Sequence, residues 1–248
     1  MPDPLLLAAL FLLAAALYAS VGHAGASAYL AAMALLGVLP EVARPTALAL
    51  NICVASFVTL RFWRAGLLQP KALLPLVIAS IPLAFIGGAI HIPASLYKPL
   101  LGAVLLVAAA GFVRTAGKAA DEGADKQPDI PILPALLLGG TIGLLSGLTG
   151  TGGGIFLSPV LIVAGWATTR QASGIASGFI LVNSISGLLG NISAVGSVPS
   201  SLPLWIGAVL VGAVIGAEIG SRRASPPQLR YALGAVLAVA GLKLIFLG

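Results

Sequence analysis

The sequence predicts an all-α polytopic membrane protein made of two inverted repeats, and three observations support this prediction. First, 59% of the 248 residues are apolar, only 8% are charged, and the mean hydropathy is +1.09. Soluble proteins carry about 25% charged residues, so this chain cannot cover a soluble surface. Second, the two halves of the chain resemble each other. Third, their basic loops occupy opposite positions. At about 20 residues per span, the length allows 8–10 helical segments.

The duplication is clearest in two glycine-rich stretches. Residues 19–37 read ASVGHAGASAYLAAMALLG, and residues 147–165 read GLTGTGGGIFLSPVLIVAG. The string LGAVL also occurs twice, at 101–105 and 233–237. We therefore divide the chain into a first membrane repeat (1–113), a cytoplasmic linker (114–131) and a second membrane repeat (132–248). Glycines that match at one constant offset are Gly22 with Gly150, Gly25 with Gly153, and Gly37 with Gly165.

Each repeat is expected to begin with a broken helical hairpin, in residues 4–39 and 132–165, that either re-enters or crosses fully. The first segment has Asp3 and no Lys or Arg before its apolar run, so we interpret it as a retained helix rather than a signal peptide. Three transmembrane helices should follow in each repeat. Their apolar runs are 46–60, 72–90 and 97–113, then 172–190, 202–220 and 229–247.

The distribution of Lys and Arg predicts that the repeats are inverted. Loop 61–71 is basic, whereas its equivalent, 191–201, contains no Lys or Arg. Conversely, loop 91–98 has one Lys and its equivalent, 221–230, has three Arg. An inverted arrangement places ten of the 13 basic residues inside, whereas unbroken single crossings would divide them seven to six. Membrane proteins retain Lys and Arg on the cytoplasmic side, which favours inversion.

The two glycine-rich turns are the candidate site. Each precedes a helix, and a helix N-terminus carries about half a positive charge and unpaired N–H donors. Two such N-termini meeting in mid-membrane would bind a small anion without a buried Lys or Arg, as inverted-repeat transporters do. Close helix packing is the alternative explanation of the glycines. The candidate substrate-binding residues are Gly22, His23, Gly25, Ser27, Asn51, Gly150, Thr151, Gly152, Gly153, Gly154 and Asn183.

Several polar residues allow two interpretations. His23 is a candidate for proton coupling, because histidine titrates near neutral pH, or it is a neutral residue bonded to backbone. Asn51 and Asn183 either join helices or line a cavity. Arg44 either attracts anions or anchors a helix at the interface. Glu218, four residues before Arg222, is expected to form a local helix pair.

These residues resemble the TauE/SafE family, the sulfite exporter or toluene-sulfonate uptake permease family, over nearly the whole chain. The strings that carry the resemblance are GHAGASAYL, SGLTGTGGGIFLSPVL, RFWRAG at 61–66 and NSISGLLGN at 183–191. The resemblance implies a duplicated bacterial inner-membrane protein that transports sulfur-containing anions such as sulfite or organosulfonates. The first turn departs from an all-glycine pattern at Ala24 and Ala26.

We therefore expect a secondary transporter of a small sulfur-containing anion, with the lipid bilayer as its other partner. It should be no enzyme, use no cofactor or metal, and bind no nucleic acid; whether it forms a homo-oligomer stays open. The alternatives are an anion channel and an intramembrane hydrolase. The hydrolase would need Ser20 or Ser146 within hydrogen-bond reach of His23.

Overall fold

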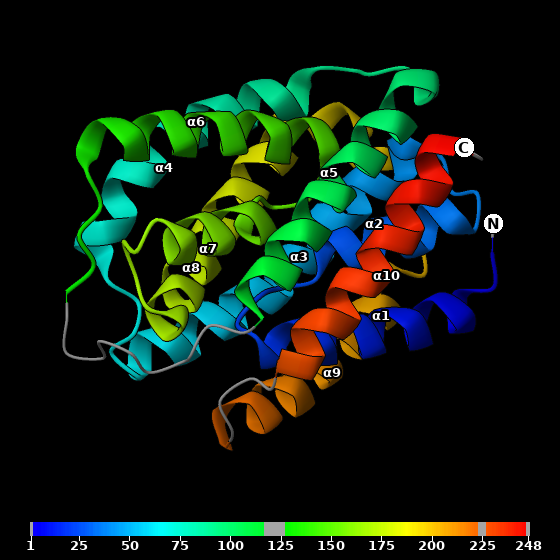
Figure 1. Ribbon diagram of the computed structural model, residues 1–248. Coiled ribbons are helices and arrows are strands. Elements are labelled where there is room, and N and C mark those ends of the chain that lie inside the picture. The colour runs from blue at the N-terminus through cyan, green and yellow to red at the C-terminus, as the bar shows by residue number, and fades with distance from the viewer. Residues whose placement is uncertain (1, 117–126, 223–226, 247–248) are drawn as a thin grey trace.

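The computed structural model describes residues 2–116, 127–222 and 227–246, and the regular elements in these ranges are all helical (Figure 1). The expected number of helical segments is confirmed. The elements are α1 (Pro4–Ser20), α2 (Ala26–Leu35), α3 (Pro40–Arg64), α4 (Pro70–Ala89), α5 (Ala94–Thr115), α6 (Ile132–Thr149), α7 (Gly154–Val163), α8 (Thr169–Gly190), the 3-10 helix η1 (Ile192–Ser197), α9 (Leu202–Arg222) and α10 (Pro227–Phe246). Most of the expected linker lies outside the described residues.

Both halves begin with a broken segment, as predicted. Short turns separate α1 from α2 and α6 from α7. Helices α2 and α7 have 10 residues each, so each spans about 15 Å, half of a hydrocarbon core. Glycine explains the breaks, because Gly25 and Gly153 cap these two helices at φ values of 98° and 80°. Residues with a Cβ rarely adopt such angles.

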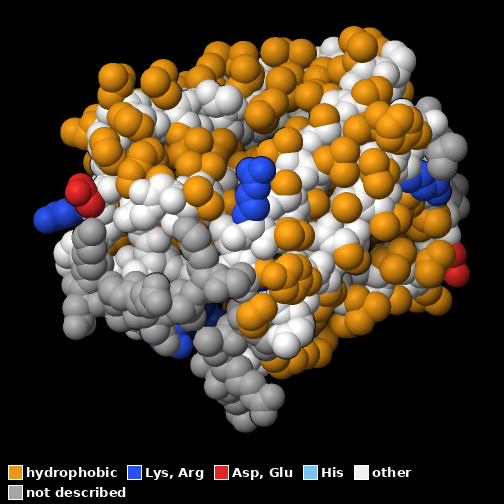
Figure 2. All heavy atoms as spheres, viewed as in Figure 1, with side chains coloured by type: hydrophobic (Ala, Val, Ile, Leu, Met, Phe, Trp, Pro, Cys, Tyr) orange, Lys and Arg blue, Asp and Glu red, His pale blue; other side chains and the backbone are white. Residues whose placement is uncertain are grey.

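Most of the remaining helices have the length and composition of membrane spans. Seven helices among the described residues are long and apolar enough to cross a bilayer. Figure 2 shows apolar side chains over most of the visible face, with few charged groups between them. Large apolar side chains are also strongly exposed on helices far apart in sequence, such as Leu5, Leu137 and Val239. Lipid is the solvent in which such a surface is stable.

Each half of the chain packs its first helix against the other half, an arrangement that we call exchanged packing. The first helix of each half packs along the fourth helix of the other half, α1 on α9 and α6 on α4. Figure 1 shows these two pairs at opposite edges of the bundle. Glycine permits the close approach, since a Cβ on Gly139 would collide with the carbonyl of Leu76, and one on Gly216 with the carbonyl of Ala16. The third and fifth helices pair with their own equivalents, α3 with α8 and α5 with α10.

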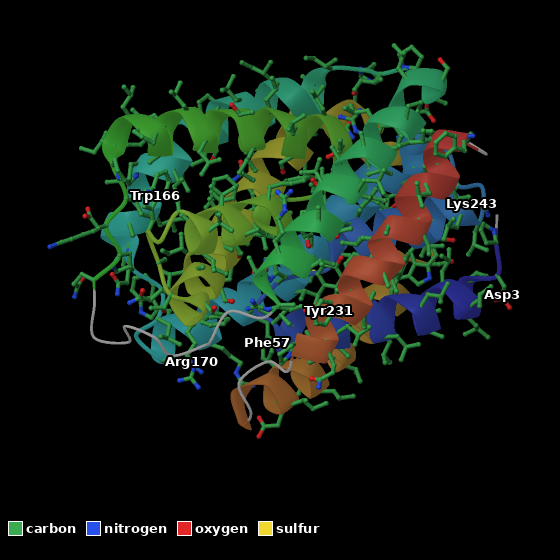
Figure 3. The ribbon with its side chains drawn as sticks, in the orientation of Figure 1. Asp3, Phe57, Trp166, Arg170, Tyr231 and Lys243 are labelled. Atoms are coloured by element: carbon green, nitrogen blue, oxygen red, sulfur yellow. The ribbon has the colours of Figure 1, made fainter. Side chains whose placement is uncertain are left out.

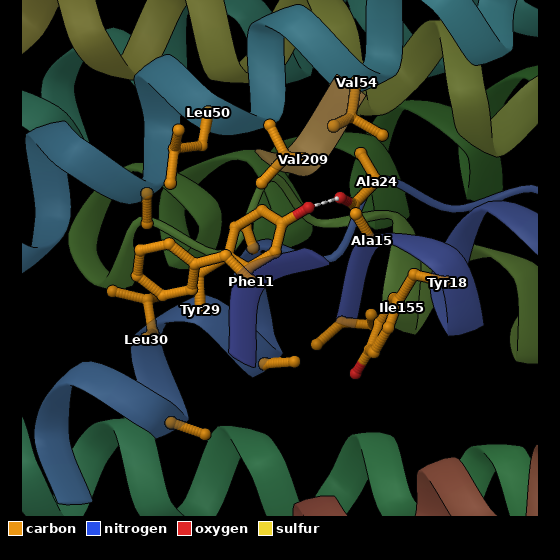
Figure 4. Packing of buried hydrophobic residues seen from close by; sticks show 14 of the residues in the cluster. Phe11, Ala15, Tyr18, Ala24, Tyr29, Leu30, Leu50, Val54, Ile155 and Val209 are labelled. Atoms are coloured by element: carbon orange, nitrogen blue, oxygen red, sulfur yellow. Dashed lines mark hydrogen bonds between the residues drawn. The ribbon is translucent and has the colours of Figure 1, made fainter. Parts of the chain in front are cut away.

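Aromatic residues fill the core between α1, α2 and α9. The ring of Phe11 packs edge-on against Tyr29 and Trp205, with centroid distances of 5.2 and 5.4 Å. The Tyr29 hydroxyl donates to the carbonyl of Ala24 at 2.7 Å (Figure 4). This bond fixes the start of α2 relative to the turn that precedes it.

Some of the charged residues lie at opposite ends of the bundle. Figure 3 shows Asp3 and Lys243 toward one end and Arg170 toward the other. Glu218, which was expected to form a local pair with Arg222, makes a contact across helices. The Glu218 carboxylate lies 3.6 Å from the Arg61 guanidinium, because the C-terminal ends of α3 and α9 lie side by side. The Arg222 side chain is outside the described residues.

Candidate functional site

The two glycine-rich turns, residues 21–25 and 150–153, meet inside the protein. At one contact, His23 Nε2 lies 3.2 Å from the carbonyl oxygen of Gly154, the first residue of α7. At another, Asn51 of α3 contacts both turns: its Oδ1 accepts from the Ala26 N–H at 3.2 Å, and it lies directly against Gly152. The N-termini of α2 and α7 are therefore neighbours, although they are more than 120 residues apart in sequence.

Asn51 is the residue that links these N-termini. Its Nδ2 donates to the Ser184 hydroxyl of α8 at 2.8 Å, while its Oδ1 holds the first N–H of α2. Asn51 and Ser184 are both fully buried. A Cβ on Gly152 would collide with the Asn51 amide, so only glycine leaves room for this link. Both interpretations of Asn51 therefore apply, because it joins helices and also faces the turns.

The start of α7 presents backbone N–H donors, whereas the first N–H of α2 is already bound by Asn51. In α7, the N–H groups of Phe156 and Leu157 both donate to the carbonyl of Gly153. The N–H groups of Gly154 and Ile155 precede this ladder, as at any helix start. Neither helix has a side-chain cap on its N-cap residue. Unpaired N–H groups and the helix dipole favour an anion at such a position.

Hydroxyl groups surround the turns, and most are already hydrogen-bonded. Ser27 Oγ pairs with the Tyr18 hydroxyl at 2.8 Å, and Thr151 Oγ1 with Thr149 Oγ1 at 3.0 Å. Ser146 is different: its hydroxyl is buried and has no hydrogen-bond partner among the described residues. Its Cβ lies 3.4 Å from the position that a Cβ on Gly153 would take. The Ser146 hydroxyl is therefore a hydrogen-bond donor next to the second turn that a ligand can use.

His23 is held between the first turn and α7. Its Nδ1 lies 3.1 Å from the carbonyl of Val21, and its Nε2 lies 3.0 Å from Ser158 Oγ. Ser20, the serine expected to pair with this histidine in a hydrolase, instead donates to the carbonyl of Leu17 at 2.7 Å. The Ser20–His23 pair of that alternative is thus not formed.

The remaining predicted residues lie at different places. Gly22 (φ 83°) packs against Ser173 of α8, and Gly150 (φ 83°) ends α6 beside the backbone of Arg44. Asn183 is buried and donates to the carbonyl of Phe179 one turn earlier in α8. No hydrogen bond joins Asn183 to either turn among the described residues, and its Oδ1 is buried without a partner. Asn51 is therefore the asparagine that hydrogen-bonds to the start of α2.

Arg44 neither anchors a helix at the interface nor stands at an open mouth. It is 4% exposed, and its guanidinium donates to four backbone carbonyls. Three of these belong to the C-terminal end of α4 and the following residue, and the fourth is the carbonyl of Gly147 in α6, at 2.9 Å. Arg44 therefore neutralises the negative ends of two helix dipoles from opposite halves of the chain.

Ser158 and Ser184 were not predicted from the sequence. Ser158 is the one hydroxyl of the apolar helix α7, and Ser184 is one of several serines of α8, so neither stands out from its surroundings. Ser184 could have been found from its neighbour Asn183, since two adjacent polar residues inside a span point to two different helix faces. Ser158 carries no signal beyond its position in the second turn's helix.

Comparisons with known proteins agree with this architecture. The family model described as "Sulfite exporter TauE/SafE" matches residues 7–244. The "Probable membrane transporter protein y4hK" of Sinorhizobium fredii is 40% identical over 240 residues, which cover 97% of each chain. The "Probable membrane transporter protein YjnA" of Bacillus subtilis is 29% identical over 93% of this chain and 95% of its own. No solved structure matches the chain.

These matches run from the first helix to the last and therefore include both broken segments and both glycine-rich turns. The relatives are named as membrane transporters, which excludes the intramembrane enzyme as the family's activity. Together with the seven span-length helices, they identify the chain as a multi-pass membrane transporter that belongs to the sulfite exporter TauE/SafE family.

Proposed function

We propose that this protein is a secondary transporter of a small sulfur-containing anion, of the sulfite or organosulfonate class, in the bacterial inner membrane. The observation that carries the proposal is the meeting of the α2 and α7 N-termini at Asn51. An anion there would receive the first N–H groups of α7, the favourable ends of two helix dipoles and a hydrogen bond from the Ser146 hydroxyl. The family name indicates sulfite for some members.

Alternating access would follow from two inverted repeats. The exchanged packing of α1 on α9 and of α6 on α4 agrees with a two-fold relation between the halves. In this mechanism, one set of helices rocks against the other around a fixed central site. In an inverted arrangement, the short helices α2 and α7 would reach the centre from opposite sides, and each would line the path to one side of the membrane.

Uptake into liposomes tests the proposal. Purified protein is reconstituted, and the uptake of radiolabelled sulfite, sulfate, thiosulfate and taurine is measured, with protein-free liposomes as the control. We expect saturable uptake of at least one anion, and acceleration by unlabelled anion inside the vesicle. Uptake without saturation or counterflow would indicate a channel. Absence of uptake of all four by folded protein would contradict the proposed substrate class.

A further inference from the structure

We infer that His23 binds a proton that is transported together with the anion. This inference deepens the proposed function and rests on it. His23 is 3% exposed and lies in the first glycine-rich turn, with its ring against the first residue of α7. A proton on this ring would therefore be a neighbour of an anion held at the two helix N-termini.

The His23 ring has hydrogen-bond partners that suit both of its protonation states. Each ring nitrogen faces a backbone carbonyl, Val21 at 3.1 Å and Gly154 at 3.2 Å. Neutral imidazole has a single N–H, so it can serve only one of these carbonyls, whereas imidazolium can donate to both. The contacts thus offer hydrogen bonds to a second proton without movement of the ring.

Ser158 provides a hydrogen bond to the His23 ring when the ring is neutral. Its hydroxyl lies 3.0 Å from His23 Nε2 and 3.5 Å from the carbonyl of Ala172. When Nε2 carries no proton, the hydroxyl donates to it. When Nε2 is protonated, the hydroxyl turns to Ala172 and leaves the ring free to donate. A rotating hydroxyl needs no other rearrangement.

Among the described residues, no carboxylate pairs with a protonated His23. The carboxylates among the described residues, Asp3, Glu41, Asp129 and Glu218, are all exposed, and none hydrogen-bonds to His23. Phe112 of α5 and Ser158 of α7 contact the ring, and the positive Arg230 of α10 acts on it electrostatically. Tyr18 packs on Phe112, and Ser173 donates to the Val21 carbonyl that also faces the ring.

With no such carboxylate among the described residues, the anion at the adjacent site would serve as the counter-ion of the imidazolium. Each then stabilises the other: the proton strengthens anion binding, and by linkage the anion strengthens proton binding by the same factor. Loading of proton and anion together would make an imposed proton gradient drive the anion.

Histidine NMR tests the protonation directly, because the chain has only His23 and His91. In ¹⁵N-histidine-labelled protein with His91→Gln, all ring signals belong to His23. We expect the neutral pattern without substrate and the imidazolium pattern when sulfite, sulfate, thiosulfate or taurine binds near neutral pH. Binding of a transported anion that leaves the ring neutral would overturn the inference.

Transport by His23→Gln provides the second measurement. Sulfate and thiosulfate are the transported anions in the pH-gradient experiment, because they do not titrate near neutral pH. We expect the variant to lose at least tenfold of the accumulation that an inside-alkaline gradient drives in the wild-type protein, and any flux that it retains should no longer depend on that gradient. Undiminished accumulation would overturn the inference. If the variant transports no anion, the NMR signals of the His23 ring decide whether the inference holds. Absence of flux and of binding in the wild-type protein would instead overturn the proposed function itself.

Discussion

The amide of Asn51 and the hydroxyl of Ser184, one from each half of the chain, form a hydrogen bond of 2.8 Å between α3 and α8. The same amide accepts the first N–H of α2. This relationship ties the start of α2 to the long helices that cross at the centre, so changes at Asn51 should alter the site before they alter the fold.

Asn51→Asp should abolish anion uptake. The substitution keeps the size of the side chain but places a negative charge against the N-terminus of α2, where helix dipoles stabilise an anion by about 0.3–1 kcal/mol. The carboxylate would occupy the donors and repel the substrate. We expect uptake to fall at least tenfold in liposomes, with little change in thermal stability.

Asn51→Ser is the matched variant for this experiment, because its hydroxyl can still accept a hydrogen bond without adding charge. It should retain measurable uptake. Full uptake by Asn51→Asp would show that the anion binds elsewhere.

Gly152→Ala should inactivate the transporter through a collision at the site. A Cβ there would strike the Asn51 amide. Gly165→Ala is the matched control, because both glycines have positive φ (75° and 71°) but a Cβ on Gly165 meets open space. Both variants carry the strain of a left-handed residue, about 1–2 kcal/mol. We expect at least a tenfold loss of uptake for Gly152→Ala alone; an equal loss in both would mean that strain, not the collision, is responsible.

Gly216→Ala should destabilise the packing of α1 on α9. Its Cβ would collide with the carbonyl of Ala16, and overpacking of this kind costs about 1–3 kcal/mol. Gly207, on the same helix, faces open space, so Gly207→Ala should be neutral or slightly stabilising. Thermal unfolding of both purified variants in detergent checks this, and equal midpoints would contradict the close contact.

Arg44→Gln should lower stability more than Arg61→Gln. The first substitution leaves buried carbonyls of α4 and α6 without donors, which costs about 1–3 kcal/mol. The second removes only a part-exposed ion pair with Glu218 at 3.6 Å, which contributes about 0–1 kcal/mol. Chemical unfolding monitored by tryptophan fluorescence would compare the two, and a larger loss for Arg61→Gln would contradict the buried role of Arg44.

Cysteine labelling should show that the repeats are inverted. With Cys53→Ser as background, Ala65→Cys and Gly196→Cys place thiols at exposed positions in equivalent loops. We expect an impermeant maleimide added to whole cells to label Cys at 196 only, and labelling of 65 to require opened cells. Labelling of both from the same side would contradict inversion.

The sequence predicted the helices well because apolar runs of span length are set by the bilayer rather than by tertiary contacts. The breaks at Gly25 and Gly153 were also predictable, since few residues other than glycine adopt positive φ. Helix partners were not, because the collision surfaces at Gly139 and Gly216 look like any small residue in a membrane helix. The pairing of Glu218 with Arg61 depends on those partners and was missed for the same reason.

The site was predicted in part. The glycine-rich turns and Asn51 were named from the sequence, since repeated glycines and a polar residue in an apolar run are visible there. The contact of His23 with Ser158, 135 residues away, depends on how the two turns meet, which no local pattern encodes. Arg44 misled sequence reasoning because a charge near a helix start usually faces water, whereas here helix ends converge on it.

The exchanged packing of the first helices has a consequence for how the protein is made. The α1 residue Pro4 hydrogen-bonds to Trp205 of α9, 201 positions later in the chain. At synthesis rates of about 5–20 residues per second, α1 leaves the ribosome about 10–40 seconds before its partner exists. During this interval the α1 face that later contacts α9 must rest against lipid or an insertion factor. Truncation before α9 should therefore leave a nascent chain that membrane proteases recognise.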